Sequence, residues 1–129
     1  MINAYEQYQR NTIMLASPQQ LLIMLYDGAI KFIKLARKAI EEKDFGQANY
    51  NLVKAQDIIS ELNINLNMDI EISKNLRSLY NFINDKLIQA NVKKSVEILD
   101  EIEPMIEDLR NTWYEASKKL KAVGDDFTR

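Results

Sequence analysis

The chain has 129 residues, the length of one domain, and its 47% apolar and 28% charged residues exclude a disordered segment. Three glycines and two prolines are too few for the many turns of a β-sandwich or barrel, which argues against an all-β fold. The net charge of −2 gives no basic footprint for nucleic acid, and the absence of cysteine and histidine excludes disulfides, thiolate zinc sites and Ser-His-Asp catalysis.

Residues 1–16 form a leader that precedes the first long helical pattern. Apolar side chains recur in it at partly helical spacing among Asn, Gln and Arg, but the pattern is too weak for a helix that stands alone. The segment lacks the charged and apolar regions of a secretory signal peptide, so we expect a cytoplasmic protein. The leader residues that we expect to dock on the rest of the chain are Tyr5, Tyr8, Ile13 and Met14.

A capping box marks the start of the first helix. Ser17 is a natural N-cap, Pro18 suits the first helical position, and Gln20 completes the box. Apolar residues at steps of three and four then predict a helix over 18–42, in which Gly28 indicates close packing against a neighbour. The core stripe that this spacing predicts is Leu22, Leu25, Ala29, Ile33, Ala36 and Ile40.

Three further helical patterns follow. Asp44 is the expected N-cap of a helix over 44–67, the third pattern covers 70–90 and ends at Asn91, and the fourth covers 94–122. Each carries one apolar stripe at helical spacing. The predicted stripes are Ala48, Leu52, Ala55, Ile59, Leu62 and Leu66; then Ile72, Leu76, Leu79 or Tyr80, Ile83, Leu87 and Ala90; then Val96, Leu99, Ile102, Ile106, Leu109, Trp113, Ala116 and Leu120.

Short corners between successive helices favour antiparallel neighbours. The apolar steps continue in phase across Pro104, so we expect one kinked helix there rather than two helices. Gly124 suits a left-handed C-terminal cap. The sequence therefore predicts an all-α, antiparallel up-down four-helix bundle over residues 17–124, with residues 1–16 as an N-terminal capping segment and residues 125–129 as a polar tail.

Catalysis, metal binding and membrane insertion are not expected. The carboxylates of the fourth helix fall mainly outside its apolar stripe, and the stripes contain no Asp or Glu to build a metal cage. No glycine-rich loop suits phosphate binding. The apolar run from Leu21 to Tyr26 is far shorter than the roughly 20 residues that span a bilayer. We therefore expect a protein without cofactor, metal, nucleic acid or membrane partner, and without enzymatic activity.

The helices carry more apolar residues than their core stripes need. The first helix is apolar around most of its circumference, although a helix of a small bundle requires only one stripe. Some of these residues widen the core, and together they favour a partner-binding groove or the surface beneath the leader. The candidate groove residues are Leu21, Met24, Ile30, Leu35, Tyr50, Val53, Ile58, Ile64, Phe82 and Met105.

The stretch from Ala16 to Ile30 reads ASPQQLLIMLYDGAI and follows a leader with spaced tyrosines. Further motifs continue in order along the chain: Lys54-Ala55, Ile58-Ile59, Glu61-Leu62, Asn75-Leu76, Leu79-Tyr80, Leu87, Gln89-Ala90-Asn91, Leu109-Arg110 and Trp113. With these motifs the sequence resembles the flagellar export chaperone FliS family over essentially its whole length. Each motif is short, but the set is specific in order and spacing.

The resemblance implies a cytoplasmic helical bundle that binds the C-terminal segment of flagellin. It further implies that this binding prevents premature polymerisation and aids delivery to the flagellar type III export apparatus. In this family the leader can cover part of the groove, which suits the apolar leader residues. Helix-in-groove recognition would use the surplus apolar side chains. The alternative is a self-associating structural bundle whose apolar surplus forms a homodimer interface.

Overall fold

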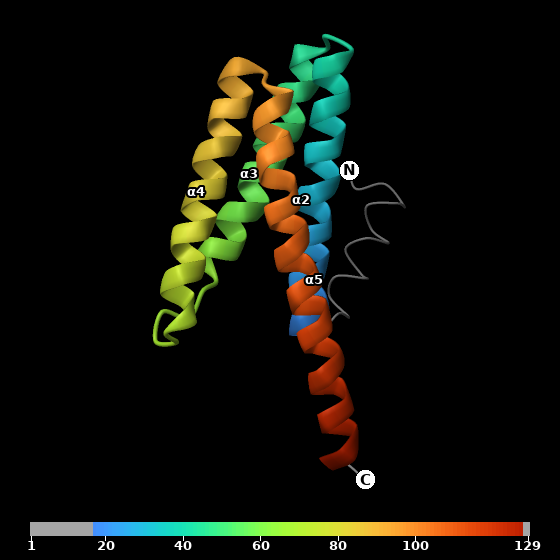
Figure 1. Cartoon of the computed structure of the whole chain (residues 1–129), viewed down its shortest axis with the longest axis vertical. Helices are drawn as coiled ribbons and strands as arrows, with labels where there is room; N and C mark the ends of the chain where they lie inside the picture. The colour runs from blue at the N-terminus through green and yellow to red at the C-terminus, as the bar shows by residue number, and fades with distance from the viewer. Residues whose placement is uncertain (1–16, 128–129) are drawn as a thin grey trace, which may run out of the picture.

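The computed structural model describes the backbone of residues 17–127 and the side chains of residues 17–119. The helices in this range are α2 (Pro18–Glu41), α3 (Phe45–Ile64), α4 (Ile72–Lys93) and α5 (Val96–Phe127). Successive helices run antiparallel, and residues 17–127 contain no strand (Figure 1). The predicted all-α four-helix bundle is confirmed. The four leader residues singled out from the sequence lie outside the described residues.

The helix starts follow the capping pattern of the sequence. The Ser17 hydroxyl accepts the Gln20 backbone N–H at 3.2 Å, and the Gln20 side chain accepts the Ser17 backbone N–H at 3.0 Å. Asp44 accepts the backbone N–H of Gln47 at 3.2 Å. These side chains satisfy amides that the first helical turn leaves without an intrahelical partner. The predicted N-caps of α2 and α3 are confirmed.

The helix ends differ more from the sequence prediction. α4 continues through Asn91 to Lys93 and ends at Lys94, which has a positive φ of 48°. Asn91 does not end the helix because its side chain donates to Asn49 of α3 at 2.8 Å instead of capping its own backbone. α5 runs through Pro104 as one helix, as predicted, but it also continues past Gly124 to Phe127, so the predicted glycine cap is wrong.

The core is a single cluster to which all four helices contribute. Most predicted stripe residues are buried, and Tyr80 rather than Leu79 takes the buried position on α4. Ile72 is 55% exposed, so its assignment to the core is wrong, because it stands at the first position of α4 where the chain leaves the α3–α4 connection. Tyr26 is fully buried although the predicted stripe of the first helix did not include it.

The size of the buried side chains changes along the bundle. At the end where α2 leads into α3 and α4 leads into α5, the buried residues include Ala36, Ala39, Ala48 and Ala90. Small side chains let neighbouring helix axes lie close together. Toward the opposite end, where α2 begins, α3 and α4 diverge from α2 and α5 (Figure 1). None of the helices in the described part of the chain is long and apolar enough to cross a membrane.

Candidate functional site

The structure sorts the predicted groove residues into two groups. One group is exposed: Leu35 is 40%, Tyr50 54%, Val53 39%, Ile64 75% and Phe82 41% exposed. The other group is half-buried and consists of Leu21, Met24, Ile30, Ile58 and Met105. Ile30, Ile58 and Met105 pack directly against the core.

One flank of α2 brings part of this set together beside α3. Leu21, Met24, Gly28 and Leu35 stand at helical steps of three, four and seven and therefore share one face of α2. A Cβ atom on Gly28 would lie 3.1 Å from Ile58 Cδ1, which shows that this face meets α3 closely. The packing role predicted for Gly28 is confirmed. We call Leu21, Met24, Gly28, Leu35 and Ile58 the α2–α3 band.

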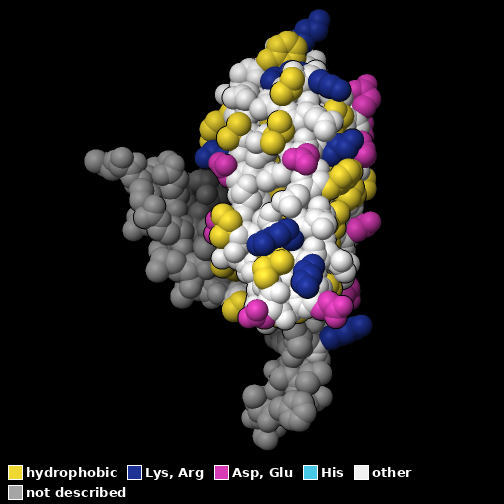
Figure 2. Space-filling view, turned by 90° about the vertical axis from the view of Figure 1, so that its left-hand side faces the viewer, with side chains coloured by type: hydrophobic (Ala, Val, Ile, Leu, Met, Phe, Trp, Pro, Cys, Tyr) yellow, Lys and Arg dark blue, Asp and Glu magenta, His cyan; other side chains and the backbone are white. Residues whose placement is uncertain are grey.

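A second apolar area lies on the outward faces of α3 and α4. Seen from the α4 side, hydrophobic side chains form several patches separated by charged and other groups (Figure 2). We call Tyr50, Val53, Ile64, Phe82, Ile88 and Val92 the α3–α4 surface; each is at least 39% exposed. Val92 was missed because Asn91 was expected to end the helix before it.

Charged side chains partly cover the rings of the α3–α4 surface. Lys54 Nζ lies 5.4 Å from the centre of the Tyr50 ring, and Lys86 Nζ lies 5.6 Å from the centre of the Phe82 ring. A cation over an aromatic face contributes roughly 0.5–1 kcal/mol at an exposed site. The two rings are thus held against their own helices by lysines one turn further along.

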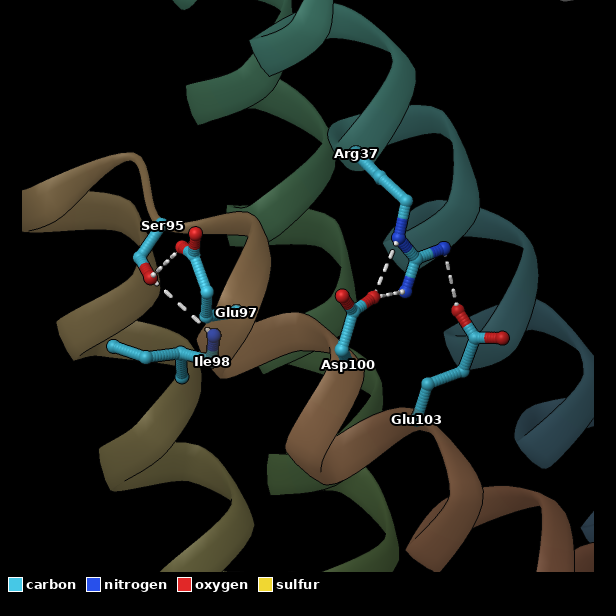
Figure 3. A network of polar contacts seen from close by, with 6 residues as sticks. All are labelled: Arg37, Ser95, Glu97, Ile98, Asp100 and Glu103. Carbon is cyan, nitrogen blue, oxygen red and sulfur yellow. Dashed lines mark hydrogen bonds and ion pairs between the residues drawn. The ribbon is translucent and has the colours of Figure 1, made fainter.

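Ion pairs join α2 to α5 across the solvated edge of the bundle (Figure 3). Arg37 contacts Asp100 at 3.0 Å and Glu103 at 2.8 Å, and Arg110 contacts Asp27 at 2.8 Å. Partial burial disfavours the charged form of Arg37, but the hydrogen bond and charge of Glu103, with Asp100, outweigh it and raise the pKa of the guanidinium. Asp100 and Glu103 of α5 therefore both pair with the Arg37 guanidinium.

A buried polar cluster connects three helices and was not found from the sequence. The hydroxyl groups of Tyr26 and Tyr80 share a hydrogen bond, and Trp113 Nε1 donates to the Tyr26 hydroxyl at 3.1 Å. Tyr26 is 0% and Tyr80 2% exposed. Tyr26 is the centre of the cluster, because its hydroxyl contacts both the Tyr80 hydroxyl and Trp113 Nε1. All three residues belong to the motifs that carry the family resemblance, but the motifs do not indicate that these side chains meet.

The tyrosine cluster predicts a loss of stability at alkaline pH. Burial raises the pKa of both Tyr26 and Tyr80, and for Tyr26 the Tyr80 hydroxyl raises it further. The folded state therefore keeps these protons above pH 10, where tyrosine in the unfolded chain loses them. We expect the free energy of unfolding to be unaffected by these groups up to about pH 9 and to fall above pH 10, by at most about 1.4 kcal/mol per pH unit for each group.

Urea unfolding at pH 7, 9, 10 and 10.5 measures this effect. The variant Tyr80→Phe removes one of the two titrating groups and a contact that raises the pKa of the other, so the alkaline slope should become smaller. Tyr50→Phe, at an exposed position, is the matched control and should keep the full slope. A stability that is equal at pH 9 and pH 10.5 would show that the buried hydroxyls do not stay protonated on folding.

The described residues offer no arrangement for metal binding. Among residues 17–119, no group of three or more Asp, Glu, His or Cys side chains is placed to hold an ion. The features that remain for function are the α2–α3 band and the α3–α4 surface.

Comparison with known proteins identifies related chains. The family model described as "Flagellar protein FliS" matches residues 1–120. The Bacillus subtilis (strain 168) protein named "Flagellar secretion chaperone FliS" is 44% identical over 114 residues, 88% of this chain and 86% of that protein. The Salmonella typhimurium protein of the same name is 34% identical over 122 residues, 92% of this chain and 90% of that protein.

A solved structure resembles the bundle as a whole. It is described as "Crystal structure of flagellar chaperone from bacteria" and superposes with a TM-score of 0.75 at 24% sequence identity. The match covers 90% of this chain and 96% of that chain. This likeness concerns the fold.

Proposed function

Because the chain belongs to the FliS family of flagellar proteins, we propose that it binds the C-terminal segment of flagellin in apolar surface grooves. Family members are flagellar secretion chaperones, and the chain is therefore a chaperone and not an enzyme. In this proposal it acts in the cytoplasm, prevents premature polymerisation of flagellin and aids its delivery to the flagellar type III export apparatus. It requires no cofactor.

The observation that carries the proposal is the α2–α3 band. Leu35 is 40% exposed within it, and Gly28 lets Ile58 of α3 pack closely against α2. Apolar side chains that share one helix face suit an amphipathic helix of a partner, which presents its own apolar side chains at steps of three and four. The α3–α4 surface gives a second apolar contact on the adjoining helix. The proposed groove residues of the described chain are Leu21, Met24, Ile30, Leu35, Tyr50, Val53, Ile58, Ile64, Phe82 and Met105.

Residues 1–16 are proposed to cover part of this groove in the free protein. Their apolar residues, Tyr5, Tyr8, Ile13 and Met14, cannot bury themselves within so short a segment. The leader joins α2 at Ser17, four residues before the first residue of the α2–α3 band. A short docked segment opens locally without unfolding the bundle, and a partner that needs the same surface must displace it.

Hydrogen exchange tests the leader. We expect the amides of residues 5–14 to show measurable protection in the free protein and a changed rate when flagellin is added, because docking and displacement alter their opening. Exchange at random-coil rates with and without flagellin would contradict the cap and leave the leader as an ordinary tail.

A homodimer is the second candidate, because the α3–α4 surface would also suit a second copy of the chain. Mixing the protein with intact flagellin and with flagellin that lacks its C-terminal segment separates the two. The chaperone proposal expects binding only to intact flagellin. Equal binding of both flagellins would overturn the assignment to the C-terminal segment. Absence of binding together with tight dimerisation would support the homodimer instead.

A further inference from the structure

Ion pairs join α2 and α5 into one unit. Arg37 of α2 holds Asp100 and Glu103 of α5, and Asp27 holds Arg110 two to three turns away toward the other end. The two contacts lie on the same helix pair but far apart along it, so they resist rotation of one helix against the other. We call α2 with α5 the first helix pair.

Amide side chains join α3 and α4 into a second unit. Asn91 donates to Asn49 at 2.8 Å and Asn84 donates to Ser60 at 3.0 Å. Nearer the α3–α4 connection, Asn63 donates to Asn81 at 2.8 Å and accepts from Arg77 at 3.2 Å. These contacts recur along most of the two helices, and polar pairs of this kind fix the register of neighbouring helices. We call α3 with α4 the second helix pair.

Few polar contacts connect one helix pair to the other. Within residues 17–119, the side-chain hydrogen bonds and ion pairs between them are the Tyr26–Tyr80 hydrogen bond and the Lys86–Glu101 ion pair at 3.6 Å. Lys86 and Glu101 are partly exposed, so their ion pair contributes little. The rest of this interface is apolar packing, most extensive between α2 and α3, where Ile58 lies close against Gly28.

The chain connections between the pairs lie at one end of the bundle. Residues 42–44 lead from α2 to α3, and residues 94–95 lead from α4 to α5. Both short connections stand at the alanine-rich end, where the helices lie close together. The longer connection at the opposite end, residues 65–71, joins α3 to α4 within the second helix pair. No described connection therefore ties the two pairs together at the end where α2 begins.

Core side chains are less completely covered at that free end. Leu62 of α3 is buried there, but leucines of α2, α4 and α5 and of the α3–α4 connection remain partly exposed to solvent. The partly buried residues of this end are Leu22, Leu25, Leu66, Leu76, Leu79 and Leu109. The second helix pair also diverges from the first toward this end (Figure 1).

We propose that the bundle opens as two rigid helix pairs, hinged at the alanine-rich end and held shut by the Tyr26–Tyr80 hydrogen bond. Opening exposes the partly buried leucines without breaking a hydrogen bond inside any helix. Hinged motions of this kind pivot on a few residues at the ends of elements, which the two short connections supply. The proposal does not rest on the proposed function, because it concerns the free protein.

Distance measurements between paired spin labels test the hinge. The chain has no cysteine, so pairs of introduced cysteines carry the labels at unique exposed positions. One pair spans the two helix pairs at the free end, a second spans them at the alanine-rich end, and two control pairs lie within one helix pair. The label pairs are Gln19→Cys with Lys74→Cys, Lys38→Cys with Lys93→Cys, Lys31→Cys with Asp108→Cys, and Asp57→Cys with Asp85→Cys.

With no tyrosine replaced, the distances between the two labels at the free end should be more broadly distributed than those of the other three label pairs. They should also extend to longer values. Tyr80→Phe should increase the long-distance population roughly fivefold, the change that corresponds to losing about 1 kcal/mol. Tyr50→Phe should leave it unchanged. A free-end distribution as narrow as those within the helix pairs would overturn the hinge, and this result needs no tyrosine variant to fold. A broad distribution that Tyr80→Phe leaves unaltered would overturn the role of the hydrogen bond.

Discussion

Replacing Tyr26 by phenylalanine should lower the free energy of unfolding by about 2–3 kcal/mol. The substitution removes the hydroxyl that accepts from Trp113 and that also pairs with Tyr80. The Trp113 N–H and the Tyr80 hydroxyl, which is almost fully buried, then lack this acceptor. Each unpaired buried group costs about 1–3 kcal/mol. For a domain whose total stability is about 5–15 kcal/mol, this is a large fraction. Urea unfolding followed by circular dichroism measures it.

The two related variants give the controls. Tyr80→Phe keeps the Trp113–Tyr26 hydrogen bond and loses only one contact, so we expect about 1 kcal/mol. Tyr50 is 54% exposed, and Tyr50→Phe should change stability by less than about 0.5 kcal/mol. Equal effects of Tyr26→Phe and Tyr80→Phe would contradict the central place of the Tyr26 hydroxyl in the cluster.

Replacing Leu35 by glutamine should weaken flagellin binding about tenfold or more. Burial of a leucine side chain contributes about 1.5–3 kcal/mol, and a tenfold change corresponds to about 1.4 kcal/mol. Leu35 is the most exposed member of the α2–α3 band, so its replacement by glutamine leaves the core intact. The stability of the free protein should change by less than about 0.5 kcal/mol. Isothermal titration with intact flagellin measures the affinity.

The matched control is Lys34→Gln, at an exposed position next to Leu35 but on a different face of α2. It should leave the affinity within about twofold, because it removes a solvated charge away from the α2–α3 band. If both variants bind flagellin as the unmutated protein does, the α2–α3 band is not the binding site.

Local signals in the sequence were sufficient to predict the fold. A capping side chain acts on an amide three residues away, so Ser17 with Gln20 and Asp44 with Gln47 are readable without a tertiary structure. Helical spacing likewise identifies the buried faces, because residues three and four apart share a face in any helix. These two rules located all four helices.

Contacts between distant residues were not readable in this way. Asn91 was expected to break α4, but its partner Asn49 lies 42 residues earlier in the chain. The same holds for Tyr26. Its buried hydroxyl accepts a hydrogen bond from Trp113 of α5 and shares one with Tyr80 of α4, and both partners are distant in the sequence. A hydroxyl-bearing ring beside a core stripe has no signal in one helix that distinguishes burial from exposure.

The candidate site was predicted only in part for a related reason. An apolar surplus on a helix shows that something covers it, but not whether the cover is another helix or a partner. Leu35 and Ile64 are exposed, whereas Ile58 and Met105, chosen by the same rule, pack against the core. The distinction depends on where α3 and α5 lie relative to α2, which the sequence of one helix does not determine.

A calorimetric titration of this protein with the C-terminal segment of flagellin, at several temperatures and two salt concentrations, tests the central claim most directly. Capture of that segment by apolar grooves predicts saturable binding with a large negative heat-capacity change, the mark of apolar burial coupled to folding. It also predicts little loss of affinity at high salt, because the net charge is only −2 and the band is uncharged. The absence of binding, or an affinity that falls steeply with salt at a small heat-capacity change, would contradict it.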